Sequence, residues 1–301
     1  MQFIDHKQVE SVLRMEDLIP LMRQTMIDFS LKKIEQPTRR ILSVAEHEGY
    51  FGSMPAISTD AVGAKLVAFY PDNDEKGLPT HMANIVLFKP ETGEPLAVMD
   101  GALITEMRTA AVSAVFIDTF AAKNVKSLAI LGAGVQAASH IEALSLIRDF
   151  EDIRICNRNI QRAEELAEKT GAHVMNSEDA VRDADVVVAA TASSEPVIKG
   201  ECLKGDAKVV SVGWAGADGG ELDAQTMANI VLVDSREGAE IESGNVRRNN
   251  AQIYAELGEV LAGEISVDKK KIVVFESIGM ACQDLSSASL VLDKLSQQTN
   301  L

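Results

Sequence analysis

The hydrophobic and polar positions follow one pattern up to about residue 100 and a different pattern after about residue 125. In the first part, a helical segment over residues 15–33 is followed by extended segments joined by short turns. Such a succession predicts a mostly antiparallel or mixed sheet. The extended segments read RRILSV, GYFGSMPA, AKLVAFY, MANIVLF and, after the hairpin-like KPETGEP, LAVMD.

In the second part, short apolar runs rich in valine and isoleucine alternate with helical segments. Near-continuous apolar strands of this kind predict a parallel sheet with both faces buried. The runs are LAILGAG, IRICNR, DVVVAAT, KVVSVG and NIVLVDS, and the first helices between them are VQAASHIEALSLI and RAEELAEKTG.

Two further segments determine the expected domain organisation. Residues 102–122 form a long helical stretch between the two patterns, and residues 270–295 predict one more strand and a final helix. We expect that final helix to return to the N-terminal domain. The length of 301 residues suits two domains of about 150 residues each. The expected fold is therefore α/β, with an α+β domain of residues 1–120 and 278–301 and a second domain of residues 121–277.

Charge and composition narrow the range of partners and compartments. The formal net charge of −16 argues against binding to nucleic acids and anionic membranes, although a local group of arginines can still bind a small anion. The three cysteines are widely spaced, which indicates a reducing compartment without structural disulfides. The N-terminal segment lacks the features of a signal peptide, and no apolar run approaches the roughly 18 residues of a membrane span. These observations predict a cytoplasmic protein.

A glycine-rich turn carries the strongest local signal. Gly132-Ala-Gly134-Val-Gln-Ala137 follows the strand SLAIL and opens a helix, which is the G-x-G-x-x-A pattern in its strand–turn–helix context. The first glycine permits the tight turn, the second lets a pyrophosphate approach the backbone, and the small third residue allows close packing. A plain tight turn of an α/β domain is the alternative. The context favours dinucleotide binding by a Rossmann domain.

The end of the next strand bears on the choice of nicotinamide cofactor. A site for NAD usually has Asp or Glu there, whereas an arginine accommodates the 2′-phosphate of NADP. This chain has Asn157 and Arg158 at that point and Arg162 one turn later. We therefore expect NADPH, with NADH as the other option. The alternative is that Arg158 is only a solvated residue at the start of a helix.

Three cations lie in apolar surroundings. Helical spacing puts Arg108 beside Ile104 and Val112, and strand alternation puts Lys65 on the face of Val67. Arg39 precedes another apolar run. Each cation alone would be expected to extend its charge to solvent or to pair with a distant acid. The three together, beside a nicotinamide-binding domain, favour a carboxylate substrate. The five histidines show no metal-ligand spacing, and we expect no metal.

These residues lie in stretches that resemble the ornithine cyclodeaminase/mu-crystallin family over essentially the whole chain. The stretches are QPTRR, GYFGSMPA, AKLVAFYP, MDGALITEMRTAAVSA, ILGAGVQAASH, ICNR, VVVAAT, ESGNV, AELGEV and SIGMA. The resemblance is greater to the mu-crystallin-type reductases than to the cyclodeaminases. It implies a homodimer in which an N-terminal substrate-binding and dimerisation domain lies beside a Rossmann domain.

The resemblance also implies roles for individual residues. Arg39 and Arg108 match the arginines that hold the substrate carboxylate, and Lys65 matches the active-site lysine. The expected cofactor contacts are Thr80, Arg108, Thr109, Gly132, Gly134, Val135, Gln136, Asn157, Arg158, Arg162, Thr191, Val212, Gly213 and Ser277.

The implied reaction is NAD(P)H-dependent reduction of a cyclic ketimine, 1-pyrroline-2-carboxylate or 1-piperideine-2-carboxylate, to L-proline or L-pipecolate. The neighbouring arginines and burial should lower the pKa of Lys65, so that it can donate a proton to the imine nitrogen. The alternatives are an alanine dehydrogenase, an ornithine cyclodeaminase and a protein that binds NADPH and a small ligand. Cyclodeaminases carry an aspartate where this chain has Ala215, with Asp218 three residues later, and this departure argues against cyclodeamination.

Overall fold

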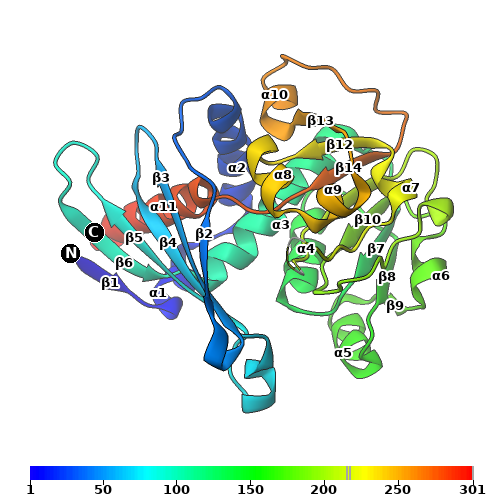
Figure 1. Cartoon of the computed structure of the whole chain (residues 1–301), viewed down its shortest axis with the longest axis horizontal. Helices are drawn as coiled ribbons and strands as arrows, with labels where there is room; N and C mark the ends of the chain where they lie inside the picture. Colours follow the sequence, from blue (N-terminus) through cyan, green and yellow to red (C-terminus); the bar gives the residue numbers. More distant parts are fainter. Residues whose placement is uncertain (215, 217, 300–301) are drawn as a thin grey trace. The chain divides into compact units, whose positions relative to one another are not determined.

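The computed structural model describes residues 1–299 except residues 215 and 217. These residues divide into two compact units (Figure 1). The first unit comprises Met1–Arg108 and the segment from Met280 onward, and the second unit comprises Thr109–Gly279. The sequence pattern predicts boundaries after residues 120 and 277. The first observed boundary, after Arg108, falls inside the long helix α3 (Ala102–Phe120), which continues without a break from one unit into the other.

The first unit contains a six-stranded mixed sheet in the order β1-β6-β5-β4-β3-β2. Neighbouring strands from β2 to β6 are antiparallel, and β1 lies parallel to β6. The predicted mixed sheet is confirmed, and the parallel edge strand β1 is an addition to it. The strands are β1 (Gln2–Ile4), β2 (Arg40–Val44), β3 (Gly49–Ile57), β4 (Val62–Phe69), β5 (His81–Phe88) and β6 (Pro95–Asp100).

Helices cover one face of this sheet. The C-terminal helix α11 (Ala281–Thr299) packs against β3, β4, β5 and helix α2, as Figure 1 shows, and so completes the N-terminal unit as predicted. Alternation along the strands turns Ile85 and Met99 toward this buried layer, where Met22 and Met26 of α2 also lie. The other elements of the unit are α1 (His6–Val12), α2 (Met15–Ser30), η1 (Ala45–His47) and η2 (Pro71–Lys76).

The second unit is built on an eight-stranded parallel sheet in the order β13-β12-β14-β11-β10-β7-β8-β9. Every residue of β10 and β11 is buried, which explains their uninterrupted apolar runs. The strands are β7 (Ser127–Leu131), β8 (Asp152–Cys156), β9 (His173–Val174), β10 (Val186–Ala189), β11 (Lys208–Ser211), β12 (Ile230–Val233), β13 (Ile253–Glu256) and β14 (Val273–Glu276).

Both faces of the parallel sheet carry a core. On one face, Val187 and Val209 pack with Val181 and Ala239 from the surrounding helices. On the other face, the ring of Phe116 in α3 stacks on the ring of Phe275, and the ring centroids are 5.3 Å apart. The Phe120 ring is tilted against Phe116 at a centroid distance of 5.0 Å. The helices are α4 (Val135–Ser145), α5 (Ile160–Thr170), α6 (Ser177–Val181), η3 (Gly200–Cys202), α7 (Ala224–Met227), α8 (Arg236–Glu242), α9 (Gly244–Asn249) and α10 (Leu257–Leu261).

The strand order reverses between β7 and β10. From β7 the chain runs outward through β8 and β9 and then returns to the other side of β7 with β10 and β11. Ligands of open α/β sheets bind beyond the carboxyl ends of the strands at such a reversal. The residues that follow β7, β8, β10, β11 and β14 therefore meet at one edge, which we call the carboxyl edge of the second unit.

Candidate active site and cofactor-binding edge

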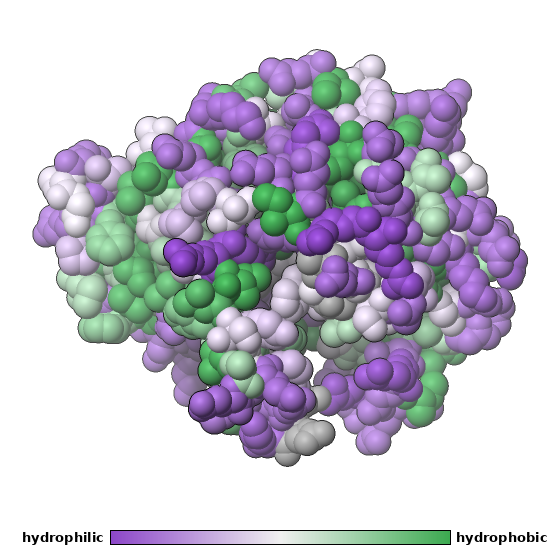
Figure 2. Space-filling view, viewed as in Figure 1, coloured by the Kyte–Doolittle hydropathy of each residue, from purple (hydrophilic) through white to green (hydrophobic). Residues whose placement is uncertain are grey.

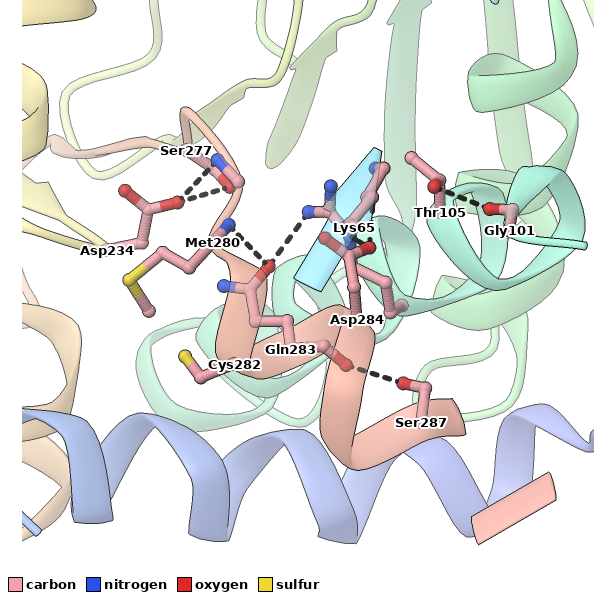
Figure 3. A network of polar contacts seen from close by, with 12 residues as sticks. Lys65, Gly101, Thr105, Asp234, Ser277, Met280, Cys282, Gln283, Asp284 and Ser287 are labelled. Carbon is pink, nitrogen blue, oxygen red and sulfur yellow. Dashed lines mark hydrogen bonds and ion pairs between the residues drawn. The ribbon is translucent and has the colours of Figure 1, made fainter. Parts of the chain in front are cut away.

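Lys65 is buried within the first unit. It lies in β4 opposite Met54 of β3 and Ile85 of β5, and its side chain points to the helical layer, with 2% of the residue exposed. Its Nζ lies 3.4 Å from Oδ1 of Asp284 on α11, and the Asp284 side chain is fully buried. Figure 3 shows the two side chains pointing toward each other. The burial of Lys65 is therefore accompanied by a direct ion pair.

Arg108 of α3 uses the same carboxylate. Its Nε donates to Oδ1 of Asp284 at 3.0 Å, and its Nη1 donates to Oε1 of Gln283 at 2.8 Å. The second oxygen of Asp284, Oδ2, is buried and has no hydrogen-bond partner among the described residues. One alternative from the sequence was that each cation pairs with a distant acid. Lys65 and Arg108 both do so, because Asp284 lies 219 and 176 residues away from them in the sequence.

The charges around Lys65 set its pKa. Burial lowers this pKa to about 8, the Asp284 carboxylate opposes the shift, and Arg108 and Arg39 add to it. Burial alone would raise the pKa of Asp284, but Arg108 and Lys65 outweigh burial and hold that pKa below its ordinary value. Three cations and one carboxylate leave two positive charges in excess when all are ionised. The first unit therefore combines an ammonium group of lowered pKa with an electrostatic preference for anions.

Other residues of the first unit contribute less directly. Arg39 is half-buried and acts on Lys65 through its charge. Burial and the Lys65 charge lower the pKa of His81 to about 4, so His81 is neutral at physiological pH. Thr80 lies in the loop before β5, where its carbonyl accepts the Tyr70 N–H at 2.9 Å. Sequence reasoning did not identify Asp284, Gln283 or His81.

The glycine-rich turn lies at the carboxyl edge of the second unit. Gly132 has a φ of +122°, and a Cβ atom there would lie 2.4 Å from the Ala190 carbonyl oxygen, so only glycine fits. A Cβ atom on Gly134 would have no neighbour within 4 Å. Gly134 is also the N-cap of α4, and no side chain caps the N–H groups of the first turn. An open approach to uncapped N–H groups fits a pyrophosphate.

Polar contacts fix the first turn of α4. One ring nitrogen of His140 lies 2.7 Å from the Gln136 carbonyl oxygen, and the other lies 2.8 Å from Ser113 Oγ. Burial lowers the pKa of His140 to about 4, which keeps the ring neutral. The side-chain Oε1 of Gln136 is buried without a hydrogen-bond partner among the described residues. This oxygen can accept a hydrogen bond from a group held at the turn, whereas the neighbouring Val135 is exposed.

The end of β8 presents a cation. Asn157 donates from Nδ2 to the Asn159 carbonyl at 2.8 Å, and the Asn159 side chain caps α5 by accepting the Arg162 N–H. Arg158 lies exposed between them, with no hydrogen bond or ion pair to any other described residue. Its guanidinium is therefore available to an external anion such as a phosphate.

The ends of β10, β11 and β14 are tied to buried carboxylates. Glu221 accepts the N–H and the hydroxyl of Thr191, both at 2.6 Å, and the Gly213 N–H at 2.8 Å. Ser277 donates its hydroxyl to Asp234 at 3.1 Å. Hydrogen bonds to Glu221 and Asp234 thus hold three of the predicted cofactor contacts, and the sequence pattern did not predict these acids. Thr109, at the start of this unit in α3, is buried.

Two predicted features of the loop after β11 have different outcomes. Ala215, the position where cyclodeaminases carry an aspartate, lies outside the described residues. Asp218 has a fully exposed side chain, and its Oδ1 is 4.0 Å from a guanidinium nitrogen of Arg247.

Among the described residues, no group of three or more His, Cys, Asp or Glu side chains could hold a metal ion. Within the same residues, none of the helices combines the length and apolar character of a membrane span.

Comparison with known proteins gives consistent relatives. The model of the ornithine cyclodeaminase/mu-crystallin family matches residues 2–299. Ketimine reductase mu-crystallin of Mus musculus is 41% identical over 98% of this chain and 97% of its own. The structure of Thermococcus litoralis Δ1-pyrroline-2-carboxylate reductase, in complex with NADH and L-proline, has a TM-score of 0.93 at 33% identity and covers 99% of this chain and 98% of that one. An archaeal alanine dehydrogenase dimer with bound NAD also has a TM-score of 0.93, at 28% identity, and covers 100% of this chain and 97% of that one.

Proposed function

The chain belongs to the ornithine cyclodeaminase/mu-crystallin family, and we propose that it is an NAD(P)H-dependent ketimine reductase. The proposed substrates are the cyclic ketimines 1-pyrroline-2-carboxylate and 1-piperideine-2-carboxylate, and the products are L-proline and L-pipecolate. The observation that carries the proposal is the buried Lys65, paired with Asp284 and accompanied by Arg108 and the charge of Arg39. Relatives named for ketimine and pyrroline-2-carboxylate reduction support it.

The cations of the first unit are suited to a substrate carboxylate. Asp284 and Gln283 occupy Nε and Nη1 of Arg108, which leaves the Nη2 group without a partner among the described residues. Arginine binds carboxylates through paired N–H donors, and the excess positive charge around Lys65 favours an anion. We assign the substrate carboxylate to Arg108 and Arg39.

Lys65 is the proposed proton donor. With a pKa of about 8 it is mostly an ammonium group at neutral pH, yet it gives up a proton more readily than an exposed lysine. The Asp284 carboxylate stabilises the ammonium form and holds Nζ in place. Lys65 would donate its proton to the imine nitrogen, which makes the C=N carbon a better acceptor of electrons. The reduced nicotinamide, when bound, supplies the hydride for that carbon.

The second unit is the proposed cofactor-binding domain. The turn from Gly132 to Gln136 would hold the pyrophosphate, and Thr191, Val212, Gly213 and Ser277 would border the nicotinamide end of the carboxyl edge. Arg158 supports NADPH over NADH because its guanidinium is free for a 2′-phosphate. The proposal includes the cofactor contacts Thr80 and Arg108 of the first unit and Thr109 of α3 on the same footing.

We propose that the chain forms a homodimer and that the exposed sheet face of the first unit is its interface. Leu42, Phe51, Ala68 and Met82 form a row across four strands, on the sheet face opposite to Lys65. Leu42, Phe51 and Met82 are exposed, and Figure 2 shows apolar side chains gathered over β2 to β5. Exposed apolar rows of this kind are typical of protein interfaces. Analytical ultracentrifugation of a Phe51→Glu variant tests this, because a dimer through the sheet face should dissociate.

Three other functions have specific support or opposition. Alanine dehydrogenase is the second candidate, because the archaeal enzyme shares the fold over the whole chain and an acyclic imine would need the same proton donor. Ornithine cyclodeamination is disfavoured by Ala215. A protein that only binds NADPH and a small ligand has no need for a lysine held in a buried ion pair.

The function is tested by the loss of reduced-nicotinamide absorbance when the purified protein is mixed with NADPH and each cyclic ketimine. NADH, pyruvate with ammonia, and ornithine with oxidised cofactor run as parallel reactions. Fast oxidation with a cyclic ketimine supports the reductase. Turnover only with pyruvate and ammonia would instead establish the alanine dehydrogenase, and proline formed from ornithine would mean that another acid replaces the missing aspartate.

A further inference from the structure

A hydrogen-bonded network joins two buried glutamates at the carboxyl edge of the second unit. Ser243 donates to Oε1 of Glu276 at 2.6 Å, and Asn245 donates from Nδ2 to Oε2 at 2.9 Å. The same Asn245 nitrogen lies 3.0 Å from Ser211 Oγ, which donates to Oε2 of Glu221 at 3.1 Å. Glu276 and Glu221 are thus linked through Ser211 and Asn245.

In the described part of the chain, no cationic side chain forms a hydrogen bond or ion pair with these carboxylates. Every donor to Glu221 and Glu276 among the described residues is a neutral hydroxyl, amide or backbone N–H. Among the described residues that line the pocket with Glu276, the charged ones are Glu221 from the loop after β11 and Glu242 at the end of α8, and both are acidic. A third acid, Asp234, accepts the hydroxyl of the adjacent Ser277. Two neighbouring buried carboxylates without a cation are costly to ionise together.

Burial raises the pKa of both Glu221 and Glu276, and the difference between their hydrogen bonds assigns the proton to Glu276. Glu221 accepts four hydrogen bonds, two of them from the backbone N–H groups of Thr191 and Gly213, and these favour its ionised form. Glu276 accepts hydrogen bonds from side chains alone, those of Ser243 and Asn245 with a smaller contribution from Ser211, and these side chains can rotate. Burial, with a smaller addition from the Glu221 charge, raises the pKa of Glu276 to about 7.

We propose that Glu276 binds and releases one proton according to the charge of the nicotinamide at this edge. It would be protonated when the site holds the neutral ring of NAD(P)H, and it would release the proton to solvent when the site holds the positively charged ring of NAD(P)⁺. The proposal rests on the proposed use of a nicotinamide cofactor, but not on the identity of the imine.

Glu276 is connected to the proposed place of the nicotinamide ring because it lines the same pocket as three predicted cofactor contacts. A pocket at this edge is lined by Val212, Gly213, Trp214, Glu221, Glu276 and Ser277, so Glu276 lies among the residues proposed to border the nicotinamide. A positive charge stabilises a nearby carboxylate and lowers its pKa. By linkage, NAD(P)⁺ should then bind more tightly as the pH rises through neutrality, and NAD(P)H should not.

Trp214 offers a direct readout because it is the single tryptophan of the chain and lines the same pocket. Its fluorescence in the full-length protein without cofactor should change with pH, with a midpoint near pH 7. The inflection should disappear in Glu276→Gln and persist in Glu237→Gln, which alters an exposed acid of the same unit. An inflection that survives in Glu276→Gln would assign the titration to another group and overturn the proposal.

The link to cofactor charge is measured by calorimetric titration with NADP⁺ and NADPH near pH 7, in two buffers of different ionisation enthalpy. NADP⁺ should release a fraction of a proton more than NADPH, and the difference should vanish in Glu276→Gln. The 2′-phosphate is common to both forms, so the difference cancels its contribution. Equal proton release by the two forms overturns the proposal. No imine is present, so a failure of ketimine reduction would leave this result unaffected.

Discussion

The two units of this protein bury carboxylates in opposite ways. In the first unit, Asp284 is fully buried but pairs with Lys65 and Arg108, which keep its pKa below the ordinary value. In the second unit, Glu276 is buried among neutral donors and other acids, and its pKa rises to about 7. The cost of burying a charge is offset by ion pairing in one unit and by proton binding in the other.

This difference suits the chemistry proposed for each unit. In the first unit, the group of Lys65, Arg108, Arg39 and Asp284 has more positive than negative charges, and its ammonium group can give up a proton, as reduction of an imino acid requires. The second unit has surplus negative charge at the edge proposed for the nicotinamide, where the charge of the ring changes during the reaction. Each unit therefore has its own titrating group, Lys65 in the first and Glu276 in the second. Variants of Lys65, Asp284 and Glu276 should show which pH effects belong to which unit.

The largest effect is expected from Lys65→Met, which removes the proton donor and keeps an apolar stem. Loss of general acid catalysis should lower kcat by about 10²- to 10⁴-fold while NADPH binding is retained. Steady-state kinetics and cofactor titration measure the two quantities. The matched control is Lys208→Met, because Lys208 is also buried but donates to the backbone carbonyls of Asp206 and Lys271. Undiminished turnover in Lys65→Met would remove the lysine from the mechanism.

The next effect concerns Asp284. Imine reduction needs the protonated lysine, so the rate of the native protein should fall above about pH 8. Asp284→Asn removes the carboxylate that opposes the lowering of the Lys65 pKa. The fall in rate at high pH, the alkaline limb of the pH profile, should therefore begin at a lower pH. At neutral pH the rate should then fall by about tenfold for each unit that the Lys65 pKa lies below the assay pH.

The pH dependence of kcat/KM distinguishes this role of Asp284 from a purely structural one. A structural defect would lower the rate at all pH values without moving the limb, and that result would contradict the assignment. Asp284→Glu, which restores the charge, should recover part of the native profile. Stability should be measured in parallel, because removal of one partner from a buried ion pair costs about 3–5 kcal/mol.

The sequence predicted the cations of the site but not the acids. Lys65 and Arg108 stand out because a charge in an apolar strand or helix face is unusual. Asp284 does not, because a single aspartate near the start of a helix looks like any solvated residue. Its partners are 176 and 219 residues away, and only the packing of α11 on the N-terminal sheet brings them together.

The same limit applies to the second unit and to its boundary. The glycine-rich turn was predictable because positive φ and close approach require glycine, whatever the rest of the fold does. Glu221 and Glu276 were not, because their network joins residues that are far apart in the sequence, such as Asn245 with Ser211 and with Glu276. The boundary within α3 could not be located either, since a continuous helix gives no local sign of where one unit ends.

A smaller effect is expected on stability through Glu276. Its pKa is raised in the folded state, so the unfolded chain loses this proton first as the pH rises. The native protein should therefore lose about 3 kcal/mol of stability between pH 4.5 and about 7 through this group. Glu276→Gln should lack that loss. Urea unfolding of both proteins across this range measures the difference, and identical pH dependence would show that Glu276 does not titrate in the folded state.

The smallest effect is expected at the opposite end of the carboxyl edge, where Arg158 is exposed and unpaired among the described residues. Arg158→Gln should weaken NADPH binding by about three- to tenfold, because a hydrogen bond to a charged group at an exposed site contributes little more than 1 kcal/mol. NADH binding should not change, since it has no 2′-phosphate. The matched control is Arg182→Gln, an exposed arginine that precedes β10 at the amino edge of the same sheet. Equal weakening of both cofactors would mean that Arg158 contacts a part that they share, such as the adenine, and that the preference for NADPH has another source.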